Sequence, residues 1–481
     1  MAGVTSEDGT LTLATRPAYE LAPLIRSKQV SPVELMRSVL DRIARLEPRL
    51  NAMAFLDEAG AMRGARRAEA AVMGSAPLGR LHGLPVTIKD LADVGGMPTR
   101  SGTRTSSADA APRDTPFVER LRAAGAIVIG KTTTSEFGWS GVSFSPLTGV
   151  THNPWRQGMN AGASSAGAGA AAAAAYGPLH QGSDGAGSIR MPAHFCGVFG
   201  LKPSFGRVPN VPLGVGDNTS HVGPITRTVM DGATMLEVMA GPHHLDHTTL
   251  EAWPAAYAAR LHEGIGGRRV AFSADLGHAT VDPAVAALVR GAAAAFAGRA
   301  GFTLEEVTPE WGPAGPDLAR RFWAAHLTRL ERLLPESEAG MDPGLVACIK
   351  AGGGTSMPDY QDLRTRKHAY IAAIHRFFED WDFLVTPTVS VAAFPVPAIR
   401  PPHWPAHQWD WLSWAEFSYP FNMAWNPAAT VPCGFTADGL PVGLQIVGRR
   451  HDDLGVLQAA AAFEAALPWA DHFPPLEETP T

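Results

Sequence analysis

The sequence of 481 residues predicts an α/β fold, a single large α/β/α domain whose mostly parallel, mixed central sheet is covered by helices. Short apolar runs typical of buried strands alternate with amphipathic segments typical of helices along most of the chain. Hydrophobic residues make up 45% of the chain and charged residues 18%, which suffices for a large core. Neither a repeat of 20 to 50 residues nor a Gly/Ser-rich linker divides it, so we expect residues 1–481 to form one domain.

The first predicted helix begins at Ser31. A capping box over 31–34 with proline at the first helical position is followed by apolar residues at helical spacing. The β-rich run 84–90 predicts a short strand that ends at Lys89. Residues 117–133 predict a helix, a stop at Gly125 and a buried strand.

The second half of the chain continues this alternation. Its predicted elements are a helix over 228–240, a strand over 268–276, a helix over 283–297, a helical region over 310–375, a strand over 381–389, a Pro/Trp-rich segment over 394–425, a strand over 439–448 and a helix over 452–466. We therefore expect a core over about 65–230, a helical and Pro/Trp-rich periphery over about 305–425, and a return to the core over about 426–470.

Bulk composition narrows the class of protein. A net charge of −6 offers no basic surface for nucleic acid, so we expect no nucleic-acid partner. The N-terminal residues lack the pattern of a signal peptide, and the alanine tract near 168–175 is too short to span a membrane. Three widely spaced cysteines, Cys196, Cys348 and Cys433, favour free thiols over disulfides. We expect a cytoplasmic protein, either a monomer or a homodimer.

Two motifs suggest other functions and are set aside by their context. Residues 125–132 match the phosphate-binding pattern G-x-x-x-x-G-K-[ST]. That loop needs a strand before it and a helix after it, whereas here a helix precedes and the motif itself is apolar and strand-like. His243, His244 and His247 lie in a polar loop without the regular placement that aligns metal ligands, so we expect no metal site.

Three side chains in or near glycine-rich turns suggest a nucleophilic site. Lys89 ends an apolar strand, where burial lowers the pKa of an amine and lets it act as a base. Ser164, in NAGASSAG, is also placed to cap the alanine-rich helix that follows. Ser188, in GSDGAGSIR, lies in a glycine-rich bend whose N–H groups can converge on an oxyanion. A lysine and two serines can move a proton without a histidine or a metal.

The amino-acid sequence around these residues resembles that of the amidase signature family. The resemblance rests on residues 83–103, 162–209 and 439–450 and extends from about residue 20 to 475. It implies a Ser-cisSer-Lys triad in which Ser188 is the nucleophile, Ser164 the relay after a cis bond and Lys89 the base. No cofactor is implied. The implied oxyanion donors are the backbone N–H groups of Gly185, Ala186, Gly187 and Ser188.

The residues around the triad have expected supporting roles. Ser165 is placed to bridge backbone groups or Lys89, while Asp184 and Arg190 are expected to brace the turn. Alanines stand at 163, 166 and 186 where the family commonly has glycine. Because alanine resists a positive φ, either those glycines are not needed for backbone freedom or the oxyanion turn is shifted here.

The resemblance implies that the periphery over about 305–425 lies on the substrate side, and the substrate is predicted from the aromatic residues of its late part. Their number favours apolar amides, and the alanine-substituted motifs resemble a branch that cleaves carbamates (urethanes). The expected substrate-binding residues are Phe144, His194, Trp414 and Trp425. The family also includes the A subunit of the glutamine-dependent tRNA amidotransferase, which remains the alternative function. A non-catalytic binding protein is a third, less favoured class because all three triad positions are present.

Overall fold

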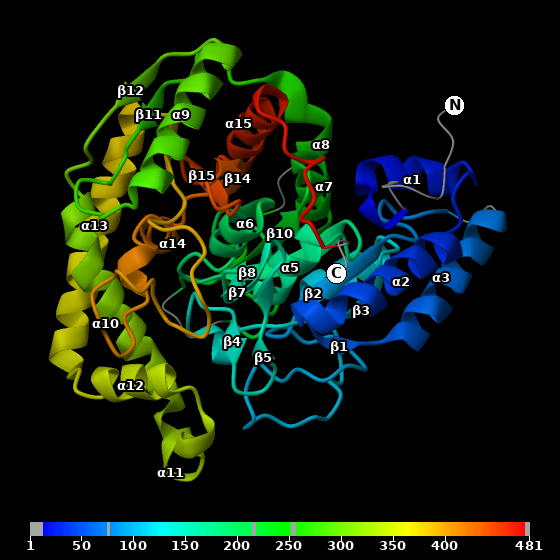
Figure 1. The fold of residues 1–481 in the computed structure, drawn as a ribbon, viewed down its shortest axis with the longest axis horizontal. Coiled ribbons are helices and arrows are strands. Elements are labelled where there is room, and N and C mark those ends of the chain that lie inside the picture. Colours follow the sequence, from blue (N-terminus) through cyan, green and yellow to red (C-terminus); the bar gives the residue numbers. More distant parts are fainter. Residues whose placement is uncertain (1–12, 75–76, 214–217, 252–255, 477–481) are drawn as a thin grey trace.

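A computed structural model describes residues 13–74, 77–213, 218–251 and 256–476. Its centre is a sheet of eleven strands in the order β1-β3-β2-β8-β10-β9-β14-β15-β13-β11-β12 (Figure 1). In chain order these strands are β1 (Met53–Leu56), β2 (Pro85–Lys89), β3 (Ile127–Thr132), β8 (Leu179–Asp184), β9 (Phe199–Lys202), β10 (His221–Thr226), β11 (Val270–Phe272), β12 (Leu304–Glu306), β13 (Phe383–Pro387), β14 (Ala428–Phe435) and β15 (Pro441–Gly448). Two small ribbons pair β4 (Phe144–Ser145) with β5 (Gly149–Val150) and β6 (His152–Asn153) with β7 (Arg156–Asn160).

The sheet is mixed, but parallel pairs do not predominate. In the described chain four neighbouring pairs are parallel, β2 with β3 and β8, and β11 with β12 and β13. The other six pairs are antiparallel. The expected parallel majority is therefore wrong. Alternating strands and helices in the sequence suggested crossover connections, which join parallel strands. In the middle of the sheet, however, strands that follow each other in the chain pair directly and antiparallel, such as β9 with β10 and β14 with β15.

Helices cover both faces of the sheet, which confirms the three-layer α/β/α architecture. Their bounds are α1 (Ala18–Arg26), α2 (Pro32–Leu50), α3 (Glu58–Met73), α4 (Pro116–Ala123), α5 (Ala166–Ala173), α6 (Arg190–Cys196), α7 (Val229–Met239), α8 (Tyr257–Arg260), α9 (Pro283–Ala300), α10 (Gly315–Leu327), α11 (Leu334–Ser337), α12 (Pro343–Gly352), α13 (Met357–Asp380), α14 (Tyr419–Met423) and α15 (Asp453–Ala466). Phe199 and Gly200 are consecutive residues of β9. The ring of Phe199 lies against Gly232 of α7, while Gly200 faces Ala193 of α6, so that a Cβ added at Gly200 would lie 2.8 Å from the Ala193 Cβ. Successive strand residues point to opposite faces, so α6 and α7 lie on opposite sides of the sheet.

The periphery forms a second apolar cluster beside the sheet. Helices α10, α12 and α13 gather at the end of the molecule opposite α1–α3 (Figure 1). Buried side chains of these helices pack with the Pro/Trp-rich segment and with Trp139. The predicted helical and Pro/Trp-rich periphery is confirmed.

Local sequence signals placed most elements correctly. The Ser31 hydroxyl accepts hydrogen bonds from the first turn of α2, and Glu34 completes the predicted capping box. The phosphate-loop pattern at 125–132 contains strand β3, paired on both sides, as its context predicted. Ser164 does not cap α5, because the N-cap position is Ser165.

The sequence also predicts neither a membrane span, nor a metal site, nor a disulfide. None of the helices in the described ranges is long and apolar enough to cross a membrane. The same ranges contain no group of three or more His, Cys, Asp or Glu side chains placed to hold a metal ion. The three cysteines form no disulfide. Residues 1–12, which make up most of the N-terminal segment without a signal-peptide pattern, lie outside the described residues.

Candidate active site

Lys89 is the last residue of β2 and is fully buried. Its Nζ lies 2.7 Å from Ser164 Oγ, 3.1 Å from Ser183 Oγ and 3.3 Å from the Ser183 carbonyl. These three acceptors match the three N–H bonds of an ammonium group. The backbone N–H of Lys89 donates to Gln181 Oε1 at 3.0 Å. The strand end and its neighbour β8 therefore fix the amine beside Ser164.

Burial lowers the pKa of Lys89 to about 7, while the Asp184 carboxylate opposes this shift in part. Near neutral pH the amine is thus divided between charged and neutral forms. Lys131, on the adjacent strand, is also buried but forms an ion pair with Asp90 at 3.3 Å. Among the described residues no carboxylate lies within ion-pair distance of Lys89 Nζ, so Lys89 is the better base of the two.

Ser164 and Ser165 occupy the turn that leads into α5. The Ala163–Ser164 bond is cis, as the resemblance implied. The Ser165 hydroxyl donates to the Ser183 carbonyl at 3.1 Å and accepts from the Ser183 N–H at 3.2 Å. Its backbone N–H donates to the Ser188 carbonyl at 3.2 Å. Ser165 thus bridges backbone groups, one of its two predicted roles, and ties the turn of Ser164 to the turn of Ser188.

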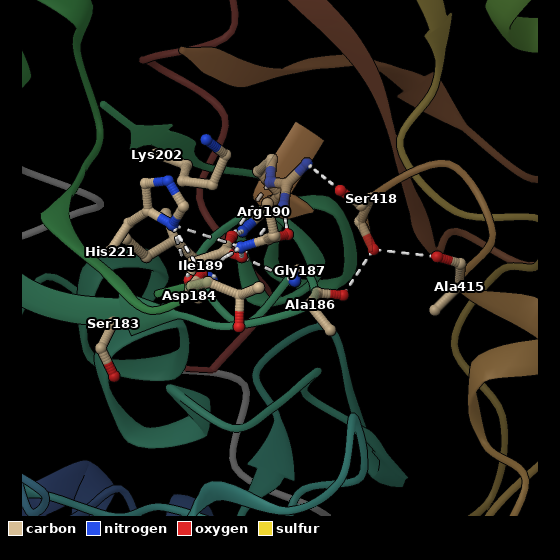
Figure 2. Close-up of polar contacts among 12 residues, drawn as sticks. Ser183, Asp184, Ala186, Gly187, Ile189, Arg190, Lys202, His221, Ala415 and Ser418 are labelled. Carbon is tan, nitrogen blue, oxygen red and sulfur yellow. Dashed lines mark hydrogen bonds and ion pairs between the residues drawn. The ribbon is translucent and has the colours of Figure 1, made fainter. Parts of the chain in front are cut away.

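The turn of Ser188 is held by Asp184, as expected. Asp184 Oδ1 accepts from Gly187 N at 2.6 Å and Oδ2 accepts from Ile189 N at 3.1 Å. Arg190 donates to both carboxylate oxygens at 2.9 Å, and both side chains are fully buried (Figure 2). Burial acts to raise the pKa of Asp184, but Arg190 outweighs it and holds that pKa well below its ordinary value. The carboxylate therefore stays ionised and keeps the bend closed around Ser188.

Residues distant in the sequence complete this bracing. Arg190 Nη1 also donates to the Ser418 carbonyl at 2.9 Å and to Gln445 Oε1 at 2.8 Å. The Ser418 hydroxyl donates to the Ala186 carbonyl at 2.6 Å (Figure 2). Asn422 Nδ2 donates to Asp184 Oδ1 at 2.8 Å. The late segment thus positions the nucleophile turn through a buried hydrogen-bonded network.

The same contacts revise the set of oxyanion donors. The N–H of Gly187 is already bonded to Asp184, so its predicted role as a donor is wrong. In the described part of the chain the N–H groups of Gly185, Ala186 and Ser188 have no acceptor. Gly185 and Ser188 also line the adjoining cavity. These three amides remain the candidates for an oxyanion hole.

The alanines of this sequence replace no glycine that the turns require. Positive φ angles fall at Gly162 (75°) and Gly187 (122°), and not at Ala163, Ala166 or Ala186. A Cβ at Gly187 would also lie 2.5 Å from Ser418 Oγ. These angles support the first of the two alternatives, that glycine is not needed for backbone freedom at positions 163, 166 and 186.

Lys89, Ser164 and Ser188 line one cavity of about 360 Å³. Ser164 is 2% exposed and Ser188 is 3% exposed, so both side chains are almost fully buried where they line this cavity. Within the described residues no hydrogen bond joins the two hydroxyls, although Lys89 contacts Ser164. Catalytic hydrogen bonds often shorten only when substrate binds.

The cavity wall differs from the predicted one. Its aromatic lining is Phe117, Phe137, Trp139 and Trp323. The Trp139 carbonyl accepts from the indole N–H of Trp323 and of Trp411, each at 2.9 Å. Trp411, from the late segment, therefore supports the wall from behind.

None of the four predicted substrate-binding residues lines this cavity. Phe144 lies in β4, and Trp414 is fully buried with its N–H donating to the Ile399 carbonyl. His194 accepts from Gly443 N and donates to the Val391 carbonyl, and burial lowers its pKa to about 4. Trp425 stacks on Phe205. The sequence did not show that His194 and Trp414 lie in the core, or that Phe144 and Trp425 lie outside the cavity lining.

Sequence reasoning missed Gln181, Ser183, and the wall residues Trp139 and Trp323. Gln181 and Ser183 alternate along β8, so period-two polarity just before the nucleophile turn was the available signal. Trp323 lies within the predicted substrate-side region but belongs to α10 rather than to the Pro/Trp-rich segment. Its approach to the site depends on tertiary packing.

A buried amine of lowered pKa beside two serines, in a cavity with free backbone N–H groups, is suited to acyl transfer.

The amidase family profile matches residues 34–457. An acylamidase of Rhodococcus erythropolis is 40% identical, covering 95% of this chain and 96% of the relative. The A subunit of the glutamyl-tRNA(Gln) amidotransferase of Moorella thermoacetica is 32% identical, covering 95% and 98%. A solved bacterial aryl acylamidase of the amidase signature family matches with a TM-score of 0.88 at 28% identity, covering 95% and 97%. The chain belongs to the amidase family.

Proposed function

We propose that this enzyme hydrolyses the C–N bond of apolar amides, including N-aryl amides and carbamates, through an acyl-enzyme on Ser188. The observation that carries the mechanism is the 2.7 Å contact of Lys89 Nζ with Ser164 Oγ, in a cavity that Ser188 also lines. The lowered pKa of Lys89 supports its role as a neutral base.

In the first half-reaction the Ser188 proton passes to Ser164, whose own proton passes to neutral Lys89. Ser188 Oγ forms a bond to the carbonyl carbon, and N–H groups of the 185–188 turn stabilise the oxyanion. Ser164 then protonates the departing nitrogen and regains its proton from Lys89 as the C–N bond breaks. Water attacks the resulting ester by the reverse relay, which releases the acid and restores Ser188.

The aromatic wall supports an apolar substrate. Phe117, Phe137, Trp139 and Trp323 offer flat apolar surfaces that suit an aryl or alkyl group. A carbamate presents the same carbonyl and C–N bond, with an alkoxy group in place of carbon. The names of the acylamidase and aryl acylamidase relatives agree with this assignment.

A second candidate is a glutamine-dependent amidotransferase component of the same kind as the Moorella protein. It is favoured by the 32% identity to that protein over nearly the whole chain. The apolar cavity wall favours the first candidate, because glutamine would leave most of this surface without a complementary group.

The test is release of aniline from N-phenyl amides and N-phenyl carbamates, with fluorophosphonate labelling of the purified protein. We expect hydrolysis of both classes and labelling of wild type, with turnover and labelling lost in Ser188→Ala. Ser140→Ala is the matched control, because Ser140 is buried outside the cavity lining. An unlabelled wild type would contradict the acyl-enzyme. Glutamine hydrolysis that requires added partner proteins would favour the second candidate.

A further inference from the structure

One cation that lines the active-site cavity, Arg329, has no counter-ion among the residues that the structure describes. Arg329 lies in the 3-10 helix Thr328–Leu333 that directly follows α10, and it reaches the cavity from the exposed rim. In the described part of the chain its guanidinium makes no hydrogen bond or ion pair. Partial burial lowers the pKa of Arg329, and the like charge of Arg332 adds to this effect.

Two acidic residues that follow Arg329 in the chain, Glu331 and Glu338, lie against other groups. A Cβ at Gly353 would lie 3.6 Å from Glu331 Oε1, so this neighbouring carboxylate lies against α12. Glu338 pairs with Lys350 at 2.6 Å. Asp93 also lines the cavity, but among the described residues no ion pair joins it to Arg329. Arg329 is exposed at the rim and lines the cavity, so a guanidinium without a counter-ion among the described residues is available to an anionic ligand that enters the cavity.

The position of Arg329 relative to the nucleophile turn follows from helix geometry. Trp323, His326 and Arg329 recur at three-residue spacing, and all three line the cavity. A Cβ at Gly185 would lie 3.9 Å from the Trp323 ring, so this tryptophan stands over the turn. Six residues of α-helix and 3-10 helix advance about 10 Å, so Arg329 lies about that far along the cavity wall.

We infer that Arg329 binds a carboxylate at the end of the substrate remote from the scissile bond. The inference rests on the proposed function and narrows its substrate class to amides or carbamates with an apolar body and a terminal carboxylate. Trp323 and Leu327, from the same helix, would contact the apolar body. A guanidinium can hold a carboxylate through two parallel hydrogen bonds. An extended chain advances about 3.5 Å per three bonds, so roughly eight bonds span 10 Å.

Matched substrates locate the carboxylate. On the acyl side, the monoanilide of octanedioic acid is compared with octanoyl anilide. On the amine side, the octanoyl amide of 4-aminobenzoate is compared with the same neutral anilide. We expect the carboxylated member of one pair to have the higher kcat/KM in wild type, with the difference mainly in KM.

Three variants test whether Arg329 causes this preference. Arg329→Gln should reduce the preference about 10- to 100-fold while changing kcat/KM for octanoyl anilide less than threefold. Arg329→Lys should retain part of it, because the charge remains but the planar fork is lost. Arg332→Gln, the same charge change three residues further on, should leave the preference intact because Arg332 does not line the cavity.

Binding separates this inference from the proposed function. Calorimetry with Ser188→Ala should show tighter binding of one of the two carboxylated anilides than of octanoyl anilide. The added Arg329→Gln change should remove that difference. An enzyme inactive on every anilide would contradict the proposed function, while this binding comparison still decides the role of Arg329. Equal binding of the carboxylated and neutral anilides with no preference in either substrate pair, or an equal loss in Arg332→Gln, would overturn the inference.

Discussion

Burial of Lys89 predicts that activity falls in mild acid. With a pKa of about 7, half of the amine is neutral at pH 7, whereas at its ordinary pKa of 10.5 only about one molecule in 3,000 would be neutral. If neutral Lys89 is the base, kcat/KM rises about tenfold per pH unit below pH 7 and levels off above it. At pH 6 it should be about a tenth of the plateau.

The assay is aniline release at low substrate concentration between pH 5 and 10, at constant ionic strength. The rate of fluorophosphonate labelling of Ser188 should follow the same curve. Ser183→Ala removes an acceptor that stabilises the Lys89 ammonium group, so the midpoint should fall by up to about one pKa unit. Thr99→Ala is the matched control, because it removes an acceptor of Lys131 instead.

Three results would refute this reasoning. The first is a profile that stays flat from pH 5 to 8, and the second is a midpoint above pH 9. The third is a midpoint that Thr99→Ala moves and Ser183→Ala does not. Lys89→Arg adds an independent check: a guanidinium remains protonated, so turnover should fall by several orders of magnitude.

The remaining predictions concern stability and substrate size. Arg190→Met leaves Asp184 buried without its cation, so urea unfolding should show a loss of about 3–5 kcal/mol, and an unchanged midpoint would contradict the bracing role. Burial raises the folded pKa of Asp231 from 3.8 to about 7, although it accepts from the N–H groups of Ala18 and Tyr19. The folded state therefore binds this proton more tightly, and on the order of 4 kcal/mol of stability present below pH 4 is lost as pH rises through 7. Asp231→Asn should reduce that decline in pH-dependent unfolding, and an identical decline would refute the assignment. Trp323→Ala should join the cavity to the hollow lined by Phe322 and Tyr419 and raise kcat/KM for bulkier anilides relative to acetanilide; an unchanged ratio would show that Trp323 does not limit substrate size.

Elements with strong local signals were predictable. The capping box at Ser31, the apolar run ending at Lys89 and the glycine stop at Gly125 each act within a few residues. The alternation of strands and helices gave the layered α/β/α class but not the direction of each strand. Strand direction depends on which strands become neighbours, and the antiparallel centre of the sheet is set by pairings that no local pattern records.

The sequence by itself determined the chemistry proposed here, because Lys89, Ser164 and Ser188 lie in sequence motifs that resemble those of the amidase signature family. Only the tertiary structure decided their setting. Packing of β2 against β8 buries the Lys89 amine and lowers its pKa, and Asp184 occupies the Gly187 N–H. The wall likewise comes from α10 and the loop at Trp139, while the late aromatic residues turn into the core. Burial, donor availability and cavity shape all depend on contacts between residues far apart in the chain, and a linear sequence does not specify which of those contacts form.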